Sequence, residues 1–257
     1  MELPKITKQQ HHILYLLYKF RFISTNQFQK LLNHKDPART QKWLKDLKNK
    51  GYVQTTFERK SYNDWSQPFV YHITPLARHI LKTNEECDLR VLSRVYKEKK
   101  RTKSFIRKCL AVVNLYLYFL SNKSAADELQ FFTEQELAPH EYFPEKRPTA
   151  YIAVRNDDET QRYFLEWFDR YTVPGAFRAV FYKYLTYADS GNWEANAQGL
   201  ELPAVLFVCP TQNGKKHIMY HAKAIFEKEF EEKIQLFVTT QGMLNGNTKN
   251  VWEKVEL

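Results

Sequence analysis

The 257-residue sequence contains few of the residues on which several classes of protein depend. Only seven glycines are present and none forms a phosphate-cradling loop, so nucleotide hydrolysis has no support. The three cysteines, Cys87, Cys109 and Cys209, are far apart and lack CxxC spacing. This pattern indicates neither a disulfide framework nor a zinc site, and it fits a reducing cytoplasm.

Long apolar runs are also missing. The first ten residues contain no apolar core of signal-peptide length. The most apolar stretch, residues 109–120, is too short to span a bilayer and includes Asn114, so we interpret it as a buried helix. We therefore expect a cytoplasmic protein that does not contact a membrane.

The sequence contains no pattern typical of nucleophilic catalysis or of a metal centre. No Ser-His-Asp or Cys-His arrangement stands out. His217 and His221 are four residues apart, but no acid occupies the matching offset, so we expect no metal there.

The charge is divided unequally along the chain, whose 43% hydrophobic and 15% aromatic content indicates a folded globular protein. Residues 1–125 carry 25 Lys and Arg against 9 Asp and Glu, a net charge of +16. Residues 126–257 carry 14 against 20, a net charge of −6. This asymmetry indicates a nucleic-acid-binding front half joined to a different rear half, with a solvated basic surface as the alternative.

The front half has the pattern of a winged helix-turn-helix domain, over residues 1–85. Apolar residues at helical spacing predict a first helix over 8–20. Ser24 followed by Gln27 predicts a capping box that opens a second helix, which continues to Leu32. A third helix is predicted from about residue 38 to 50, ended by Gly51.

The third helix separates into two faces. Four residues fall within one arc and are expected to pack on the other helices: Thr40, Trp43, Leu44 and Leu47. Polar and basic residues occupy the opposite arc, and their side chains suit base and phosphate contacts in a major groove: Arg39, Gln41, Lys42, Lys45, Lys48 and Asn49. The alternative is a helix face that is merely soluble.

A hairpin follows the third helix. Alternating residues predict strands over 52–60 and 67–73, with a polar tip at 61–66 that forms the wing. Arg59 and Lys60 are candidates for phosphate contacts. Trp65 either stacks on nucleic acid or folds back on the hairpin. Thr74 is predicted to cap the next helix, with Pro75 in its first turn.

A basic segment over residues 86–104 is expected to form a helical linker. Lys99, Lys100 and Arg101 are its candidate phosphate contacts, although runs of charge are usually just solvated.

The rear half, residues 105–257, has an alternating helix and strand pattern. Helices are predicted over 105–121, 174–188 and 216–232. Apolar runs predict strands over 129–137, 149–154, 162–168, 204–209 and 234–240. The expected fold class is mixed α+β and α/β, with a mixed sheet flanked by helices.

The chain resembles the replication-relaxation family of plasmids and other mobile elements. Segments along most of the chain carry the resemblance, including "YKFRFISTNQFQKLL", "TQKWLKDLKNKGYV", "YHITPLARHIL", "RPTAYIAV" and "RYFLEWFDRYT". The resemblance implies an N-terminal winged helix joined to a restriction-endonuclease-like, PD-(D/E)xK domain.

It also implies a position for the ancestral nuclease site. Such sites hold Mg²⁺ with an aspartate after a proline and with an acid on the next strand, often near a lysine. Here the aspartate position is Thr149, and Glu166 and Asp169 are separated by one residue more than in the family pattern. Arg170 follows, and Lys183 falls where the family often has a basic residue. We therefore expect a degenerate site that binds no metal and needs no cofactor.

The resemblance implies a duplex-DNA-binding protein of plasmid replication or conjugative mobilisation. Its expected partners are DNA and a relaxase or replication initiator. The protein could also form a homodimer. Arginines and lysines near the degenerate site are candidates for holding phosphate: Arg147, Arg155, Arg170, Arg178 and Lys183. The alternatives are a metal-dependent endonuclease with a displaced site, which would need Mg²⁺, and a winged-helix transcription regulator.

Overall fold

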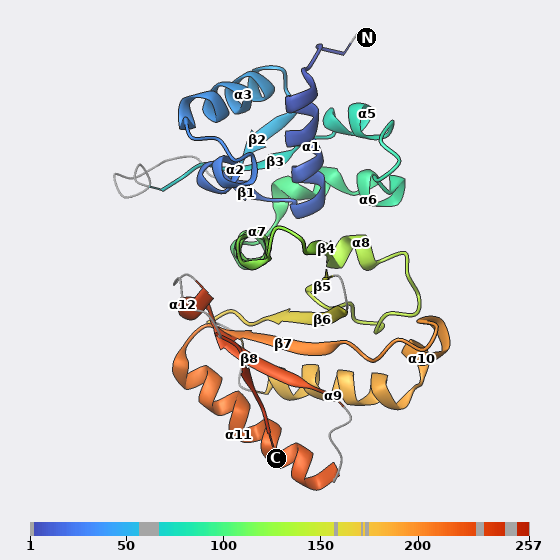
Figure 1. The fold of residues 1–257 in the computed structure, drawn as a ribbon. Helices are drawn as coiled ribbons and strands as arrows, with labels where there is room; N and C mark the ends of the chain where they lie inside the picture. Colours follow the sequence, from blue (N-terminus) through green and yellow to red (C-terminus); the bar gives the residue numbers. More distant parts are fainter. Residues whose placement is uncertain are drawn as a thin grey trace. The chain divides into compact units, whose positions relative to one another are not determined.

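The computed structural model describes residues 3–56, 67–156, 159–170, 172, 175–229, 234–244 and 251–256 (Figure 1). The chain divides into two compact units, a front unit of residues 1–117 and a rear unit of residues 118–257. The front unit therefore extends past residue 85. It takes in the predicted linker and most of the helix that was expected to open the rear domain.

The front unit begins with the three predicted helices, α1 (Lys8–Phe20), α2 (Thr25–Leu31) and α3 (Pro37–Asn49). The predicted capping box at the start of α2 is present, because the Ser24 side chain accepts from the Gln27 backbone and the Gln27 side chain accepts from the Ser24 backbone. Gly51 ends the third helix with φ +79°, a conformation that residues with a Cβ adopt rarely. These local predictions are confirmed.

A small antiparallel sheet packs with these helices. Its strands are β1 (Ile23–Ser24), β2 (Val53–Thr55) and β3 (Val70–Ile73), in the order β1-β3-β2. The β2–β3 pairing is the predicted hairpin, while its tip lies outside the described residues.

The predicted cap at Thr74 is wrong. The next helix, α5 (Ala77–Leu81), has Leu76 at its N-cap without a side-chain hydrogen bond. The Thr74 hydroxyl instead donates to the backbone carbonyl of Gly51, at 2.7 Å, and so ties the end of β3 to the start of β2.

The predicted linker is folded against the rest of the front unit. It contains α6 (Leu89–Ser93) and the 3₁₀ helix η1 (Val95–Lys100), and it leads into α7 (Lys103–Asn122). The Gln27 amide that completes the α2 capping box also donates to the Leu110 carbonyl and to Asn114, at 2.7 Å each. This amide fixes α7 to α2.

By length and composition alone, α7 is apolar enough to cross a membrane, a test that core helices of soluble proteins also pass. Five of its residues are buried in the fold: Ile106, Cys109, Val112, Val113 and Leu115.

The rear unit contains a mixed six-stranded sheet in the order β4-β5-β6-β7-β8-β9. The strands are β4 (Glu128–Thr133), β5 (Ala150–Arg155), β6 (Thr160–Trp167), β7 (Ala204–Cys209), β8 (Leu236–Thr240) and β9 (Glu253–Lys254). The β6–β7 and β7–β8 pairs are parallel and the others antiparallel. The expected mixed sheet flanked by helices is confirmed.

Helices α9 (Ala176–Asp189) and α11 (Gln212–Glu229) cover one face of this sheet (Figure 1). Their apolar side chains pack on alternate strand residues, including Phe164, Phe207 and Val238. The shorter helices are α8 (Glu134–Leu137), α10 (Asn192–Asn196) and α12 (Gln241–Leu244).

The prediction of one strand over residues 129–137 is wrong in its second half. The strand β4 ends at Thr133, where a capping box with Glu136 opens α8. The local cap therefore overrides the apolar pattern that continues to Leu137.

Candidate functional site

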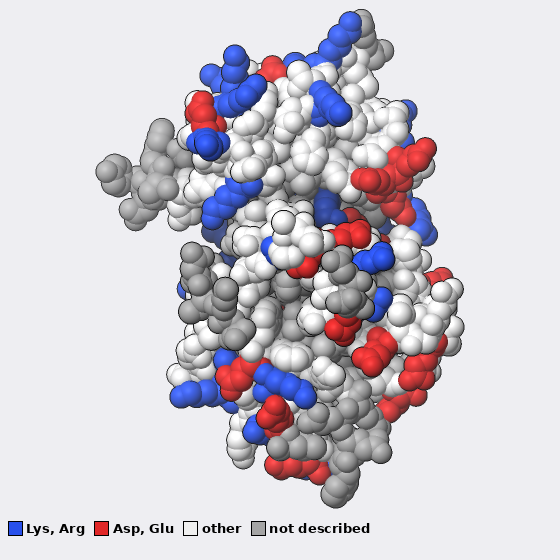
Figure 2. Space-filling model, viewed as in Figure 1, with Lys and Arg blue, Asp and Glu red and all other residues white. Residues whose placement is uncertain are grey.

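The outer face of α3 carries the six side chains predicted for base and phosphate contacts, and all six are exposed: Arg39, Gln41, Lys42, Lys45, Lys48 and Asn49. The opposite face packs into the front unit through Thr40, Leu44 and Leu47, which are fully buried, while Trp43, predicted on the same face, is half-buried. The predicted separation of the two faces is therefore present, and Figure 2 shows Lys and Arg side chains over α3.

Two of these cations have contacts within the unit. The Arg39 guanidinium lies 5.4 Å from the centre of the Trp43 ring, and the Lys48 ammonium donates to Thr55 at 3.2 Å. Within the part of the chain that the structure describes, Gln41, Lys42 and Lys45 make no side-chain hydrogen bond or ion pair. These three side chains are therefore available to an external ligand.

Contacts with α1 fix the orientation of α3. The Asp46 carboxylate accepts from Gln10 on α1 and from Lys50, each at 2.6 Å. The hydrogen bond from Lys50, followed by that from Gln10, lowers the pKa of Asp46. A rigid helix that presents unpaired cations is suited to bind a polyanion.

The three basic candidates in the predicted linker, Lys99, Lys100 and Arg101, differ in their surroundings. Lys99 and Lys100 are exposed on η1. Arg101 lies 3.8 Å from the buried Glu98 carboxylate and 4.8 Å from the centre of the Phe105 ring. Glu98 also pairs with Arg21. Arg101 thus helps to neutralise a buried acid inside the front unit.

The remaining candidates in the hairpin, Arg59, Lys60 and Trp65, lie outside the described residues.

The rear unit brings together three of the residues predicted for the degenerate site. The pairing of Ala150 with Leu165 places Thr149 opposite Glu166 on the neighbouring strand. The Thr149 hydroxyl donates to Oε2 of Glu166 at 3.0 Å. The Lys183 ammonium, which extends from α9, donates to Oε1 at 2.6 Å.

A fourth member of this cluster, Tyr184, was not predicted. Its hydroxyl donates to Oε1 of Glu166 at 2.8 Å, and its ring stacks on Phe164 with centroids 5.5 Å apart. Burial, reinforced by the Glu166 carboxylate, holds the pKa of Tyr184 well above its usual value, so the hydroxyl remains a donor. A tyrosine on an apolar helix face is usual in a core, and the sequence contains no signal for this contact.

The donor set of this cluster does not fit a divalent metal. Glu166 is the one carboxylate among its four side chains, and both of its oxygens accept from protein donors. A Mg²⁺ ion needs several oxygen ligands, and a single carboxylate whose two oxygens already accept from Thr149, Lys183 and Tyr184 does not supply them. Within the described residues, no group of three His, Cys, Asp or Glu could hold a metal. Lys183 supplies the positive charge instead.

Asp169 and Arg170 lie beyond the end of β6, and neither is among the donors or acceptors of Glu166. The Asp169 carbonyl accepts from the Thr172 backbone at 2.8 Å, which starts the turn toward α9.

Two of the other basic candidates have contacts in the rear unit. Arg147 donates to the carbonyls of Leu137, Phe143 and Pro144, so it holds a loop in place. The Arg178 guanidinium lies 2.9 Å from Nδ1 of His221. Arg155 lies at the far end of β5, away from Glu166.

Comparison with known families gives one match. The family model described as "Replication-relaxation" matches residues 14–201, which is well over half of the chain. The match spans both compact units, from α1 to the segment before β7, and confirms the resemblance seen in the sequence. No curated protein matches.

Proposed function

The chain belongs to the replication-relaxation family, and on this basis we propose that it is a duplex-DNA-binding protein of plasmid replication or conjugative mobilisation. It acts at an origin of replication or as an accessory of the relaxosome. The observation that carries the proposal is the exposed α3 face, where Gln41, Lys42 and Lys45 have no partner among the described residues.

The front unit supports a winged helix-turn-helix assignment. Three helices and an antiparallel three-stranded sheet follow one another in the order that this class of domain uses, and α3 is in the position of the recognition helix. In this arrangement α3 enters the major groove, and the hairpin between β2 and β3 lies along the backbone. Lys99 and Lys100 add contacts that do not depend on sequence.

The rear unit, in this proposal, is an endonuclease-like domain that no longer cleaves DNA. Thr149 takes the position where the family pattern has a metal-binding aspartate, and the Glu166 carboxylate accepts from Thr149 and Lys183. The net negative charge of the rear half suits a protein partner better than DNA. We assign to it the docking of a relaxase or a replication initiator, in the cytoplasm and away from membranes.

The α3 face can be tested by changing Lys42 and Lys45 together to Ala. Duplex affinity should fall, and the slope of log K against log salt should become shallower by roughly 0.9 for each lost phosphate contact. The matched control is Lys82→Ala, which removes an exposed cation at the end of α5 and should leave both quantities unchanged. Equal losses in the two proteins would refute the assignment of α3.

The endonuclease alternative has a separate test. The unmodified chain should leave supercoiled plasmid intact in Mg²⁺ or Mn²⁺. Nicking that disappears in Glu166→Gln would establish a metal-dependent endonuclease in place of a degenerate site.

A further inference from the structure

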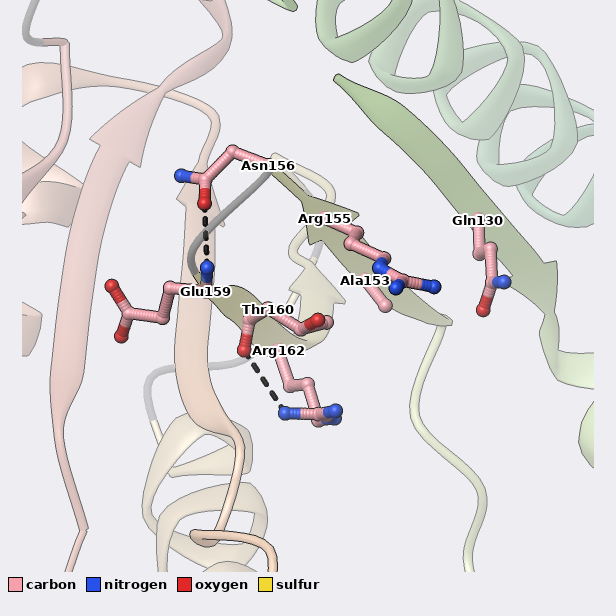
Figure 3. Close-up of a pocket in the computed structure, with 7 residues that line it drawn as sticks. All are labelled: Gln130, Ala153, Arg155, Asn156, Glu159, Thr160 and Arg162. Carbon is pink, nitrogen blue, oxygen red and sulfur yellow. Dashed lines mark hydrogen bonds between the residues drawn. The ribbon is translucent and has the colours of Figure 1, made fainter. Parts of the chain in front are cut away.

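A pocket of about 360 Å³ opens on the antiparallel part of the rear sheet, far along β5 and β6 from Glu166. Its lining residues come from β4, β5, β6 and the described ends of the β5–β6 turn: Gln130, Ala153, Arg155, Asn156, Glu159, Thr160 and Arg162. Figure 3 shows the side chains of Arg155 and Arg162 extending to the same side, toward Gln130. The Glu159 carboxylate points away from them.

The strand register explains why the arginines share this pocket. Gln130, Ala153 and Arg162 form one row across the three strands, and Arg155 pairs with Thr160 in the next row of the same face. Alternate residues of a strand point to the same face. Since the central residue of the row is Ala153, space remains between the long side chains of Gln130 and Arg162 on either side of it.

The two guanidinium groups form no ion pair within the described part of the chain. Arg162 donates to the Thr160 carbonyl at 2.9 Å, which orients its fork. Neither Arg155 nor Arg162 forms an ion pair with a carboxylate among residues 126–156 and 159–170. Glu128, which is opposite Arg155, instead accepts from Gln130 at 3.3 Å. An oriented Arg162 fork beside the Arg155 guanidinium, neither of them ion-paired within the described residues, suits the oxygens of a phosphate group.

The acidic residues at the rim of the pocket restrict the kind of phosphate compound that can bind there. Glu128 and Glu159 are exposed on either side of the arginines. They would repel a continuous phosphodiester backbone that ran across the sheet. A phosphomonoester is compact and carries a charge of about −2 at neutral pH, which matches the two arginines.

An aromatic surface is adjacent to the pocket. Phe132 and Tyr151 pair across β4 and β5, with ring centroids 6.2 Å apart, and Phe132 is 37% exposed. Burial raises the pKa of Tyr151, and the nearby Arg162 charge opposes that rise, so the guanidinium lies close to this ring. The aromatic row is two residues along the strand from the Gln130 row. This is about 6.6 Å, the scale that separates a base from its 5′-phosphate.

We infer that the Arg155–Arg162 pocket binds a 5′-phosphomonoester, with the attached base on Phe132. The phosphate comes from a free nucleotide or from the 5′-phosphorylated end of a DNA strand. The site does not depend on the function proposed for α3.

The phosphate contact can be tested by titrating thymidine 5′-monophosphate, and separately thymidine, into the full chain and following binding by NMR. Neither compound is a duplex, so neither engages a recognition helix. The monophosphate should bind at least about tenfold more tightly, as charge-assisted hydrogen bonds predict. Arg155→Gln and Arg162→Gln should each bring that ratio close to one. The control Arg178→Gln changes an exposed arginine on α9 and should preserve the ratio.

Phe132→Ala tests the base contact. It should weaken thymidine 5′-monophosphate about tenfold and leave the binding of inorganic phosphate unchanged, because stacking acts on the base alone. Circular dichroism confirms that each variant is folded, and Arg162→Lys, which keeps the charge but loses the fork, should give an intermediate ratio.

Single-stranded oligothymidine with and without a 5′-phosphate distinguishes the two sources. Tighter binding of the phosphorylated strand than of the monophosphate assigns the site to strand ends, and equal binding assigns it to free nucleotides. The inference is overturned if thymidine binds as well as its monophosphate. It is also overturned if Arg155→Gln and Arg162→Gln keep the full preference.

Discussion

Replacing Lys183 with Met should destabilise the rear unit more than the loss of an ordinary ion pair does. The Lys183 and Glu166 side chains are 14% and 11% exposed, and their charged atoms are 2.6 Å apart. Removing one partner of a buried pair costs about 3–5 kcal/mol, since the other charge is left without compensation. The hydrogen bonds from Thr149 and Tyr184 remain, so we expect about 3 kcal/mol, the lower end of this range.

A double-mutant cycle measured by urea unfolding isolates this effect. Glu166→Gln removes the charge that Lys183 compensates, so Lys183→Met should cost much less in that background. Lys50→Met is the control, because its pair with Asp46 is 28% and 44% exposed and should contribute about 0.3–0.5 kcal/mol. The reasoning is refuted if Lys183→Met costs less than about 1 kcal/mol, or if the cost is the same with and without the Glu166 charge.

Two further predictions concern the front unit. Gln27→Ala should cost about 1–3 kcal/mol in urea unfolding, because the Leu110 carbonyl, Asn114 and the start of α2 all lose a partner. The half-buried Gln29 makes one long hydrogen bond, to the Lys35 carbonyl at 3.4 Å, so Gln29→Ala should cost less. Burial, followed by the charge of Lys99, lowers the pKa of His72 to about 4 from its usual 6.5. The unfolded chain then binds more protons, so the contribution of His72 is complete above pH 6.5 and is lost as the pH falls toward 4, by at most about 1.4 kcal/mol per pH unit. His72→Leu should flatten the pH dependence of thermal unfolding in this window, and an unchanged slope would contradict the burial of a neutral imidazole.

The sequence predicts best the features that adjacent residues determine. The capping box of Ser24 and Gln27, the Gly51 stop and the two faces of α3 all depend on spacings of a few residues. Such spacings act in the same way wherever the helix is placed in the fold.

The features that the sequence does not predict depend on residues far apart in the chain. The Thr74 hydroxyl bonds to Gly51 across the hairpin, and the Tyr184 hydroxyl reaches Glu166 only after α9 packs on β6. The charge of Arg101 suggests an exposed contact, but its neighbour Glu98 is 5% exposed and accepts from Arg21 as well. No periodicity reports these tertiary contacts.

The strand order of the rear sheet has a consequence for the order of folding. In the parallel pair β6–β7, Tyr163 pairs with Ala204, which is distant in sequence. The outer edge of β8 is covered only when β9 pairs with it, Val238 with Glu253. During synthesis the helices of the front unit emerge before the rear sheet and close over short loops, whereas the edge of β8 stays open until β9 has been synthesised. Pairings over such sequence separations form slowly, and open strand edges promote aggregation. Chaperone dependence during expression should therefore come from the rear unit.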